Sequence, residues 1–342
     1  MARRRGGEPA ERRSAGKAAA VLAGGLLLAL LLYHAGVGPV LVRLGALGWG
    51  TPFILLPYLV IAAFDALGWR CTLPAQARVP FGAVYLARMA GEAVNSLTPT
   101  AVTGEPLKAH LLRAWGVSAA DGVASIVIAK TALTVSQIFF ILLGLAALFD
   151  RLDQEALGAA WLALLMVVAI AFCLTLVRFQ RRGPALAVWR WLRRLVPRAG
   201  FVARLEGGAQ GIDARLADFY RIERGAFLRS TLWHLCGWLG GIFEVMLLTA
   251  LIGTPVGLRD ALLIEALAQP IRAVALVIPG GLGAQEVGGV ALCRFLGVPE
   301  PAAVTLWLLK RARELAFDGV GLAYLARWTA SRRTRIEAGD AA

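Results

Sequence analysis

Charged side chains occur inside stretches of this 342-residue sequence that are otherwise almost wholly apolar. They are Glu92, Glu105, Lys108, Arg113, Lys130, Glu244, Glu265, Arg272, Glu286, Arg294, Lys310, Arg311, Arg313, Glu314 and Asp318. A charge at the centre of a membrane-spanning helix costs about 2.5–3.5 kcal/mol on insertion scales, so such residues are expected to face a bundle interior or a water-filled cavity. Side chains of both signs in one cavity could bind a charged headgroup or exchange a proton.

Two groups of polar residues share the spacing i, i+4, i+7, which places three side chains on one face of a helix. They are Arg88, Glu92 and Asn95 in one stretch, and Glu265, Gln269 and Arg272 in another. We expect both faces to line a cavity. The alternative is that neighbours such as Arg88 and Glu92 neutralise each other as an i,i+4 pair and have no further role.

Proline and glycine interrupt the two stretches that contain these faces, 81–114 and 260–298. The breaking residues are Pro99, Gly104 and Pro106 in the first stretch and Pro279, Gly280, Gly281 and Gly283 in the second. Because proline and glycine end helices, each stretch is predicted to form a helix–break–helix hairpin. A half-helix then begins after each break, and its free N–H groups attract anions. Glu105 and Glu286 fall in these first turns, where they could cap the helix or take up a proton or cation; Thr103 is a further candidate cap.

Further charges lie in the apolar runs that follow the hairpins. Lys130 lies in the first of these runs, and Arg311, Glu314 and Asp318 share one helix face in the second. Unpaired cations there, together with the half-helix N-termini, predict an electropositive centre suited to a phosphate-bearing headgroup. The predicted substrate-binding residues are Glu92, Asn95, Glu105, Lys108, Lys130, Gln269, Arg272, Glu286, Arg311 and Glu314.

Known enzyme and metal-site motifs are missing from the sequence. It has no HExxH, GxSxG, Walker A or GxGxxG motif, and its three histidines (His34, His110 and His234) are far apart. Each histidine is expected to be an interfacial or packing residue. No catalytic residue, metal ion or cofactor is therefore predicted.

The elements that must position these residues are helices long enough to cross a membrane. Hydrophobic residues make up 58% of the chain and charged residues 17%, against about 25% charged in soluble domains, which excludes a soluble globular enzyme. Six runs could span about 30 Å of hydrocarbon at 1.5 Å per residue. They are 18–36, 52–70, 121–149, 157–177, 229–252 and 302–328. The predicted fold is an all-α polytopic membrane protein with six transmembrane helices and two re-entrant helical hairpins.

The two halves of the sequence resemble each other at an offset of 181 residues. This offset aligns Glu105 with Glu286 and Lys130 with Arg311. We infer two repeats of span, hairpin and span, over 52–149 and 229–328, within one transmembrane domain over 18–328. The two repeats enter the membrane from opposite sides, and such inverted repeats with broken helices are typical of transporters.

Three segments outside the apolar runs hold the whole net charge of +14: 1–17, 178–229 and 327–342. Excess Lys and Arg beside spans marks the cytoplasmic side. This orientation places the tail 1–17, the loop 178–228 and the tail 329–342 in the cytoplasm, for a multi-pass protein of the cell inner membrane. Membrane topology accounts for the charge, and no nucleic-acid partner is predicted.

The motifs at the two breaks resemble those of the lysylphosphatidylglycerol synthase transmembrane-region family, which is also called flippase-like. The similar segments are 91–99 with 103–108, then 279–286, and the pair Trp69-Arg70. Thr103 departs from the glycine that is common at its position. The resemblance implies a role in making, flipping or trafficking lipids. No aminoacyl-transferase domain follows the last predicted span, so the chain is expected to be a stand-alone member without synthase activity.

Three functions stay open on the sequence. The leading hypothesis is a flippase that moves or presents an amphipathic lipid across the inner membrane. The first alternative is an intramembrane transferase on a lipid-linked substrate, with Glu105 or Glu286 as the base. The second is a non-transporting partner of a lipid-modifying enzyme. Membrane lipids are the expected partners, and the oligomeric state is not predicted.

Overall fold

The computed structural model describes residue 26 and residues 29–98, 102–152, 155–195, 205–275 and 283–339. These residues form helices joined by turns and short 3-10 segments, with no strand among them. The predictions made for the tail 1–17 and for Pro99, Pro279, Gly280 and Gly281 lie outside the described residues.

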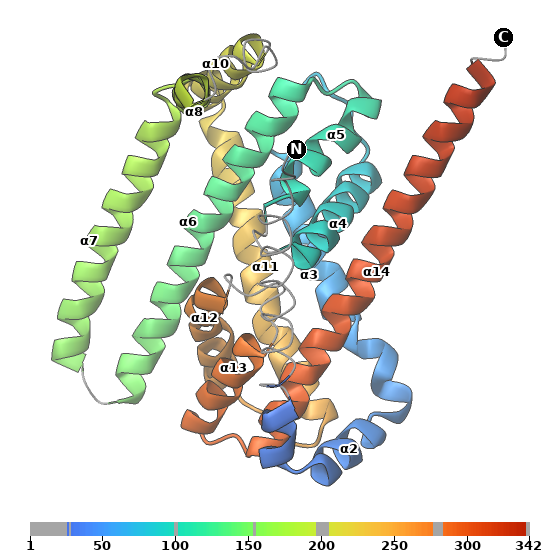
Figure 1. The fold of residues 1–342 in the computed structure, drawn as a ribbon. Helices are drawn as coiled ribbons and strands as arrows, with labels where there is room; N and C mark the ends of the chain where they lie inside the picture. Colours follow the sequence, from blue (N-terminus) through green and yellow to red (C-terminus); the bar gives the residue numbers. More distant parts are fainter. Residues whose placement is uncertain are drawn as a thin grey trace, which may run out of the picture.

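Long helices run along the molecule and form its framework (Figure 1). They are α3 (Leu56–Arg70), α6 (Ala119–Arg151), α7 (Glu155–Gln180), α11 (Arg224–Leu251) and α14 (Glu300–Gly339). Four of the described helical segments are long and apolar enough to cross a membrane: Gly48–Arg70, Ala119–Arg151, Gly158–Gln180 and Arg224–Leu251. Of the predicted spans, 302–328 is not among them. It lies within α14, where a central charged cluster interrupts the apolar sequence.

The predicted first span, 18–36, lies partly outside the described residues and ends at a sharp bend. A helix over Ala29–Ala35 meets α2 (Val37–Ala46) at an angle of 88°. The bend is at Gly36, whose φ of +78° lies in the left-handed region that glycine adopts without strain. The 3-10 segment η1 (Gly48–Ile54) then leads into α3, and Pro57 occupies an early helical position where its missing N–H costs nothing. If this bent pair of helices counts as one span, the described residues contain up to five candidate membrane spans.

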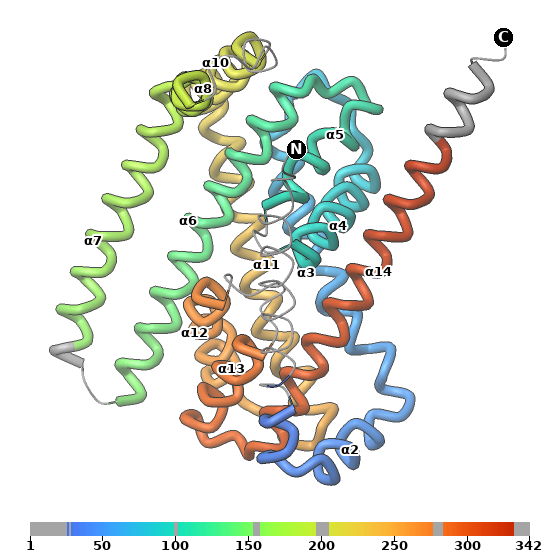
Figure 2. The backbone as a smooth tube through the Cα atoms, in the orientation of Figure 1, coloured from blue at the N-terminus to red at the C-terminus, as the bar shows by residue number. Residues whose placement is uncertain are grey.

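Both predicted hairpins are pairs of helices separated by a break. The first is α4 (Phe81–Leu97) with α5 (Gly104–Leu112), and the second is α12 (Leu258–Ala275) with α13 (Ala284–Phe295). Figure 2 traces the first pair in the half of the bundle near α8 and α10 and the second pair in the opposite half, near α2. The two hairpins therefore lie in opposite halves of the molecule. Pro270 lies inside α12 and ends neither arm.

Two amphipathic helices cross one end of the bundle. They are α8 (Pro184–Leu195) and α10 (Glu206–Ile222), and Figure 1 shows them lying across the ends of α7 and α11. Trp189 of α8 is buried against Ala209 of α10, while Trp191 stays exposed. The far end of α14 reaches this same end of the molecule. The described parts of the basic segments 178–229 and 327–342 therefore lie at one end of the fold.

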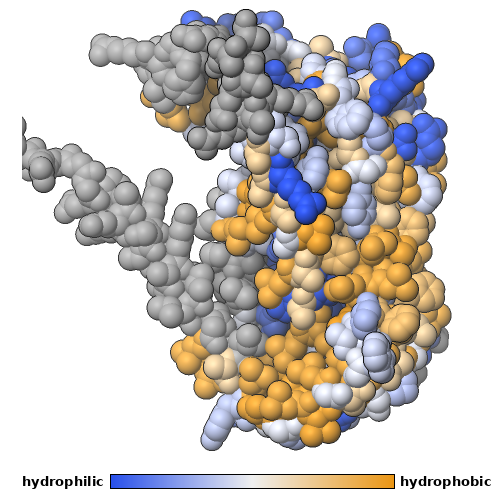
Figure 3. All heavy atoms as spheres, turned by 90° about the vertical axis from the view of Figure 1, so that its right-hand side faces the viewer, coloured by the Kyte–Doolittle hydropathy of each residue, from blue (hydrophilic) through white to orange (hydrophobic). Residues whose placement is uncertain are grey.

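Small residues allow the helices to approach closely. A side chain at Gly240 of α11 would meet Ile61 of α3, and one at Gly321 of α14 would meet the backbone of α4 at Met89. Lipid tails are as apolar as the helix surfaces, so the hydrophobic effect does not drive helices together inside a membrane. Close packing at small residues holds them together instead. The outer surface is correspondingly apolar: Figure 3 shows a broad band of hydrophobic side chains, with hydrophilic ones gathered mainly at the end that holds α8 and α10.

Candidate functional site

Lys108 lies at the centre of the charge cluster in the first hairpin. Its Nζ is 2.5 Å from Oε1 of Glu92 on α4 and 3.1 Å from Oε1 of Glu105 on α5. Glu105 also pairs with Lys130 of α6, at 3.0 Å. The Lys108 side chain is 6% exposed, whereas that of Lys130 is 46% exposed. Two cations thus contact the Glu105 carboxylate, of which Lys108 is buried and Lys130 is exposed.

Asn95 supplies the cap of the half-helix α5. Its Oδ1 accepts the backbone N–H of Gly104 at 2.7 Å, and its Nδ2 donates to Glu105 Oε1 at 3.0 Å. Thr103 makes no side-chain cap hydrogen bond, so the prediction that it caps this helix is wrong; its hydroxyl instead contacts that of Thr98. The carboxylates of Glu105 and Glu286 contact cations: Lys108 and Lys130 for Glu105, and Arg311 for Glu286. One arm of the hairpin therefore caps the other.

Two buried carboxylates and two buried cations form the second cluster. Lys310 of α14 contacts Glu244 of α11 at 3.0 Å and Glu265 of α12 at 2.6 Å. Arg313 pairs with Glu244 at 2.5 Å and lies over the ring of Tyr58. The side chains of Lys310 and Glu244 are 2% and 1% exposed, so their charges must be compensated within the protein.

Gln269 and Arg272, the other two residues of the predicted α12 face, surround Glu265. Gln269 donates to the carbonyl of Glu265 at 3.0 Å and to its Oε1 at 3.3 Å. Arg272 Nη1 is 3.5 Å from Glu265 Oε1. The three residues of the i, i+4, i+7 face therefore form a single polar network. Glu265 and Arg272 line the cavity, whereas Gln269 is buried and is not part of the lining.

Glu286 and Glu105, which the repeat aligned, have equivalent partners. Glu286 near the start of α13 pairs with Arg311 of α14 at 2.7 Å, as Glu105 near the start of α5 pairs with Lys130 of α6 at 3.0 Å. Arg311 also contacts Glu314 at 2.9 Å. In both halves, the glutamate of the second half-helix binds a cation on the long helix that follows.

A third polar group joins α3, α4 and α11. Asp65 Oδ2 accepts from Arg88 at 2.5 Å, and its Oδ1 is 3.1 Å from His234 Nδ1. Asp65 and His234 were not among the predicted site residues. The i,i+4 alternative for Arg88 is wrong, because Arg88 pairs with Asp65 and Glu92 pairs with Lys108.

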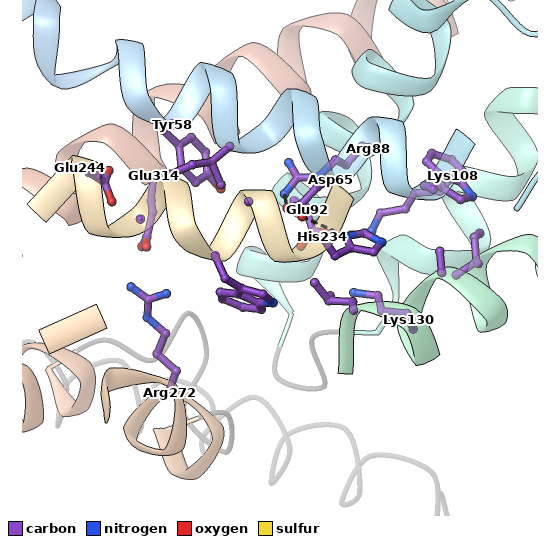
Figure 4. A pocket seen from close by; sticks show the side chains of 18 of the residues that line it. Tyr58, Asp65, Arg88, Glu92, Lys108, Lys130, His234, Glu244, Arg272 and Glu314 are labelled. Atoms are coloured by element: carbon purple, nitrogen blue, oxygen red, sulfur yellow. Dashed lines mark hydrogen bonds and ion pairs between the residues drawn. The ribbon is translucent and has the colours of Figure 1, made fainter. Parts of the chain in front are cut away.

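One cavity of about 310 Å³ is bordered by residues of all three groups. Its charged lining consists of Asp65, Arg88, Glu92, Glu105, Lys108, Lys130, Glu244, Glu265, Arg272, Arg313 and Glu314, with His234 beside them. Figure 4 shows Arg272 extending from α12 toward Glu314 at one end, Lys108 and Lys130 at the other end, and Asp65 with His234 between them. The six acidic residues outnumber the five basic ones by one, so the predicted electropositive centre is not found in the described lining.

The ten predicted binding residues divide into two sets. The cavity lining includes Glu92, Glu105, Lys108, Lys130, Arg272 and Glu314. The other four support it from behind: Asn95, Gln269, Glu286 and Arg311. Among the residues that the prediction missed, Glu244, Glu265 and Arg313 already stood out in the sequence as charges in apolar runs. Asp65 shares that signal, as the one charge between Tyr58 and Gly68.

This arrangement can bind a polar group and exchange protons, and the described residues contain no cluster of His, Cys, Asp or Glu suited to a metal ion. Buried acceptor and donor atoms remain without hydrogen-bond partners at Glu105 Oε2, Arg272 Nε and His234 Nε2. A ligand bearing both donors and acceptors could satisfy them. Aromatic rings of Tyr58, Trp69 and Trp238 complete the lining, as is common in ligand pockets.

Comparison with known proteins gives one match. The family model described as lysylphosphatidylglycerol synthase TM region matches residues 17–320, which is nearly the whole chain. No curated protein and no solved structure matches the sequence. The family and the apolar helices indicate a multi-pass membrane protein connected to lipid metabolism.

Proposed function

The chain belongs to the lysylphosphatidylglycerol synthase TM region family, and from this premise we propose that it is a lipid flippase. It moves or presents an amphipathic lipid with a polar headgroup between the two leaflets of the inner membrane. The observation that supports this function best is the charged cavity, whose lining includes residues of both helical hairpins.

The size of the cavity matches a headgroup rather than a whole lipid. Its volume of about 310 Å³ is at the lower limit of ligand pockets, which run from about 300 to 1,000 Å³. Acyl chains therefore stay in the bilayer, beside the apolar outer surface. The exposed Lys130 side chain and the partly exposed Glu92 side chain provide the first polar contacts for an entering headgroup.

We propose the membrane arrangement that follows from charge and repeat. Six spans and two re-entrant hairpins form an inverted repeat over 52–149 and 229–328, within a domain over 18–328. The basic end with α8 and α10, and both chain termini, face the cytoplasm. In support, α8, α10 and the end of α14 lie at one end of the fold, and excess Lys and Arg marks the cytoplasmic side. Alternating access then follows from rocking of one half against the other.

The test is a leaflet-resolved lipid-transfer assay in proteoliposomes, with labelled lipids that carry anionic, zwitterionic or uncharged headgroups. Glu105→Gln removes the charge that holds both Lys108 and Lys130. We expect it to slow transfer by at least about tenfold, equivalent to about 1.4 kcal/mol. Asp218→Asn is the matched control, since Asp218 is an exposed acid on α10.

The possible results separate the three candidate functions. Transfer by the wild type that Glu105→Gln abolishes and Asp218→Asn preserves supports the proposal. Equal transfer by both variants removes the site assignment. A chemically altered lipid made by the purified protein favours the transferase, and transfer only after a lipid-modifying enzyme is added favours the non-transporting partner.

A further inference from the structure

The pair formed by Asp65 and His234 lies between the charged ends of the cavity. We propose that His234, held by Asp65, is a proton-binding site that couples lipid movement to a proton gradient. This inference rests on the proposed function and identifies its coupling ion.

The hydrogen bond fixes which imidazole nitrogen is free. An ionised carboxylate only accepts hydrogen bonds, so Nδ1 of His234 bears the hydrogen that points to Asp65 Oδ1, 3.1 Å away. Nε2 then keeps its lone pair. It is buried and has no hydrogen-bond partner among the described residues, although His234 borders the cavity. Imidazole is the one side chain that normally changes charge between pH 5 and 8.

Charges of both signs face His234 from the helices packed around it. They are Asp65 on α3, Arg88 and Glu92 on α4, Lys108 on α5 and Lys130 on α6, with Glu265, Arg272, Arg313 and Glu314 at the far end of the cavity. Asp65 is the directly bonded partner and the source of stabilisation for an imidazolium ion. The pair fits closely into the helix interface, because a side chain at Gly68 would lie 2.7 Å from His234 Nε2 and one at Gly237 would lie 3.2 Å from Asp65 Oδ1.

Proton uptake would act on the first hairpin through Asp65. A hydronium ion in the cavity transfers its proton to the Nε2 lone pair, an N–H bond forms and water is released. The imidazolium then competes with Arg88 for the same carboxylate. Arg88 has a second acid one helical turn away in Glu92, which in turn holds Lys108 at 2.5 Å. One proton on α11 therefore changes the pairing of both arms of the hairpin, and its release restores the original pairs.

The chain offers matched controls, because its other histidines, His34 and His110, are exposed and absent from the cavity lining. We would compare wild type, H234Q, H34Q and H110Q in proteoliposomes with and without an imposed pH gradient in the range of about pH 5 to 8. The gradient should accelerate lipid transfer by wild type, H34Q and H110Q, while H234Q transfers at one rate in both conditions. A response of H234Q equal to that of wild type, or a wild type whose transfer ignores the gradient, overturns the inference but leaves the flippase proposal intact.

A second measurement uses the intact protein, in case H234Q does not fold. Protein labelled at histidine gives three imidazole NMR signals, and H34Q and H110Q assign two of them. The third, from His234, is followed over about pH 5 to 8 for the change in chemical shift that proton binding at Nε2 produces. A His234 signal that stays unchanged over this range overturns the proton site. Absence of lipid transfer by the wild type under every condition defeats the flippase proposal instead, and with it the coupling.

Discussion

Arg88 donates to Asp65 across the interface of α3 and α4, with 2.5 Å between Nη2 and Oδ2, although Glu92 lies one turn away on its own helix. This choice of partner attaches the first hairpin to α3. Because Asp65 also contacts His234 at 3.1 Å, the same carboxylate attaches it to α11. The side chains of Arg88 and Asp65 are 12% and 19% exposed, so the pair is screened only weakly by solvent.

Asp65→Asn should therefore destabilise the fold strongly. Removing one partner of a buried ion pair leaves an uncompensated charge and costs about 3–5 kcal/mol. The midpoint of thermal unfolding in detergent should fall well below that of wild type. Asp218→Asn, at an exposed i,i+3 pair with Arg221, should leave it nearly unchanged. Adding Arg88→Gln to Asp65→Asn should recover part of the lost stability. Equal unfolding midpoints for Asp65→Asn and Asp218→Asn would contradict this role of Asp65.

Gly68 tests the packing around the same pair. A Cβ at this position would lie 2.7–2.9 Å from three atoms of the His234 ring. Overpacking of this kind costs about 1–3 kcal/mol, so Gly68→Ala should lower the unfolding midpoint. Gly82→Ala is the control, since Gly82 is an exposed helical glycine and a Cβ added there would have nothing within 4 Å. That change should stabilise α4 by about 0.5–1 kcal/mol, and a result of the same sign at both positions would refute the close contact.

Helix boundaries and breaks were predictable from local sequence. The run 121–149 corresponds to α6 (Ala119–Arg151), and the breaks fall between α4 and α5 and between α12 and α13, as proline and glycine predicted. The predicted first span ends at Gly36, where the chain bends by 88°, but the helix α2 that follows the bend was not predicted.

Partners of charged residues were less predictable. His234 and Asp65 lie 169 positions apart, and no local pattern relates them. The prediction of an electropositive centre was wrong for the same reason. Lys310 contacts Glu244 and Glu265 on two other helices, and only the packing of those helices shows that its charge is neutralised. The internal repeat aligned Glu105 with Glu286 and Lys130 with Arg311, but only the structure shows that each of these glutamates pairs with the cation in its own half.

Tyr220 provides a prediction for pH. It lies on α10, outside the membrane-spanning helices, and donates to Gln180 at the end of α7. Burial raises the pKa of Tyr220 to about 12, from an ordinary value of 10.0. The folded state therefore keeps this proton more tightly than the unfolded state does. Its contribution to stability, about 2–3 kcal/mol for two pKa units, is complete below pH 10 and is lost as pH rises to 12.

The Tyr220→Phe variant isolates this effect. Its unfolding midpoint should lie below that of wild type at neutral pH because a buried hydrogen bond is lost. The gap should narrow between about pH 10 and 12. A gap that is constant across this range would show that Tyr220 ionises equally in both states. Tyr33, an exposed tyrosine, supplies the control as Tyr33→Phe, which should show no gap that depends on pH.

Asn95 gives the sharpest test of how the first hairpin sets the geometry of the cavity. Its amide both caps α5 at Gly104 and orients Glu105 toward Lys108 and Lys130. Asn95→Ala removes both contacts, and loss of a cap costs about 0.5–2 kcal/mol. Asn95→Asp keeps an oxygen for the cap but replaces the donor to Glu105 with a second negative charge.

Both variants should transfer lipid at least about tenfold more slowly, a cost of about 1.4 kcal/mol. Asn95→Ala should lower the unfolding midpoint because the cap is lost. Asn95→Asp should lower it because a second carboxylate is then buried beside Glu105. Thr98→Ala removes the neighbouring hydroxyl, which contacts Thr103 and backbone carbonyls of α4 but not Glu105, and it should retain most of both stability and transfer. Transfer by Asn95→Asp at the wild-type rate would mean that the orientation of Glu105 does not limit passage of the headgroup, because the cap alone would then account for the position of α5.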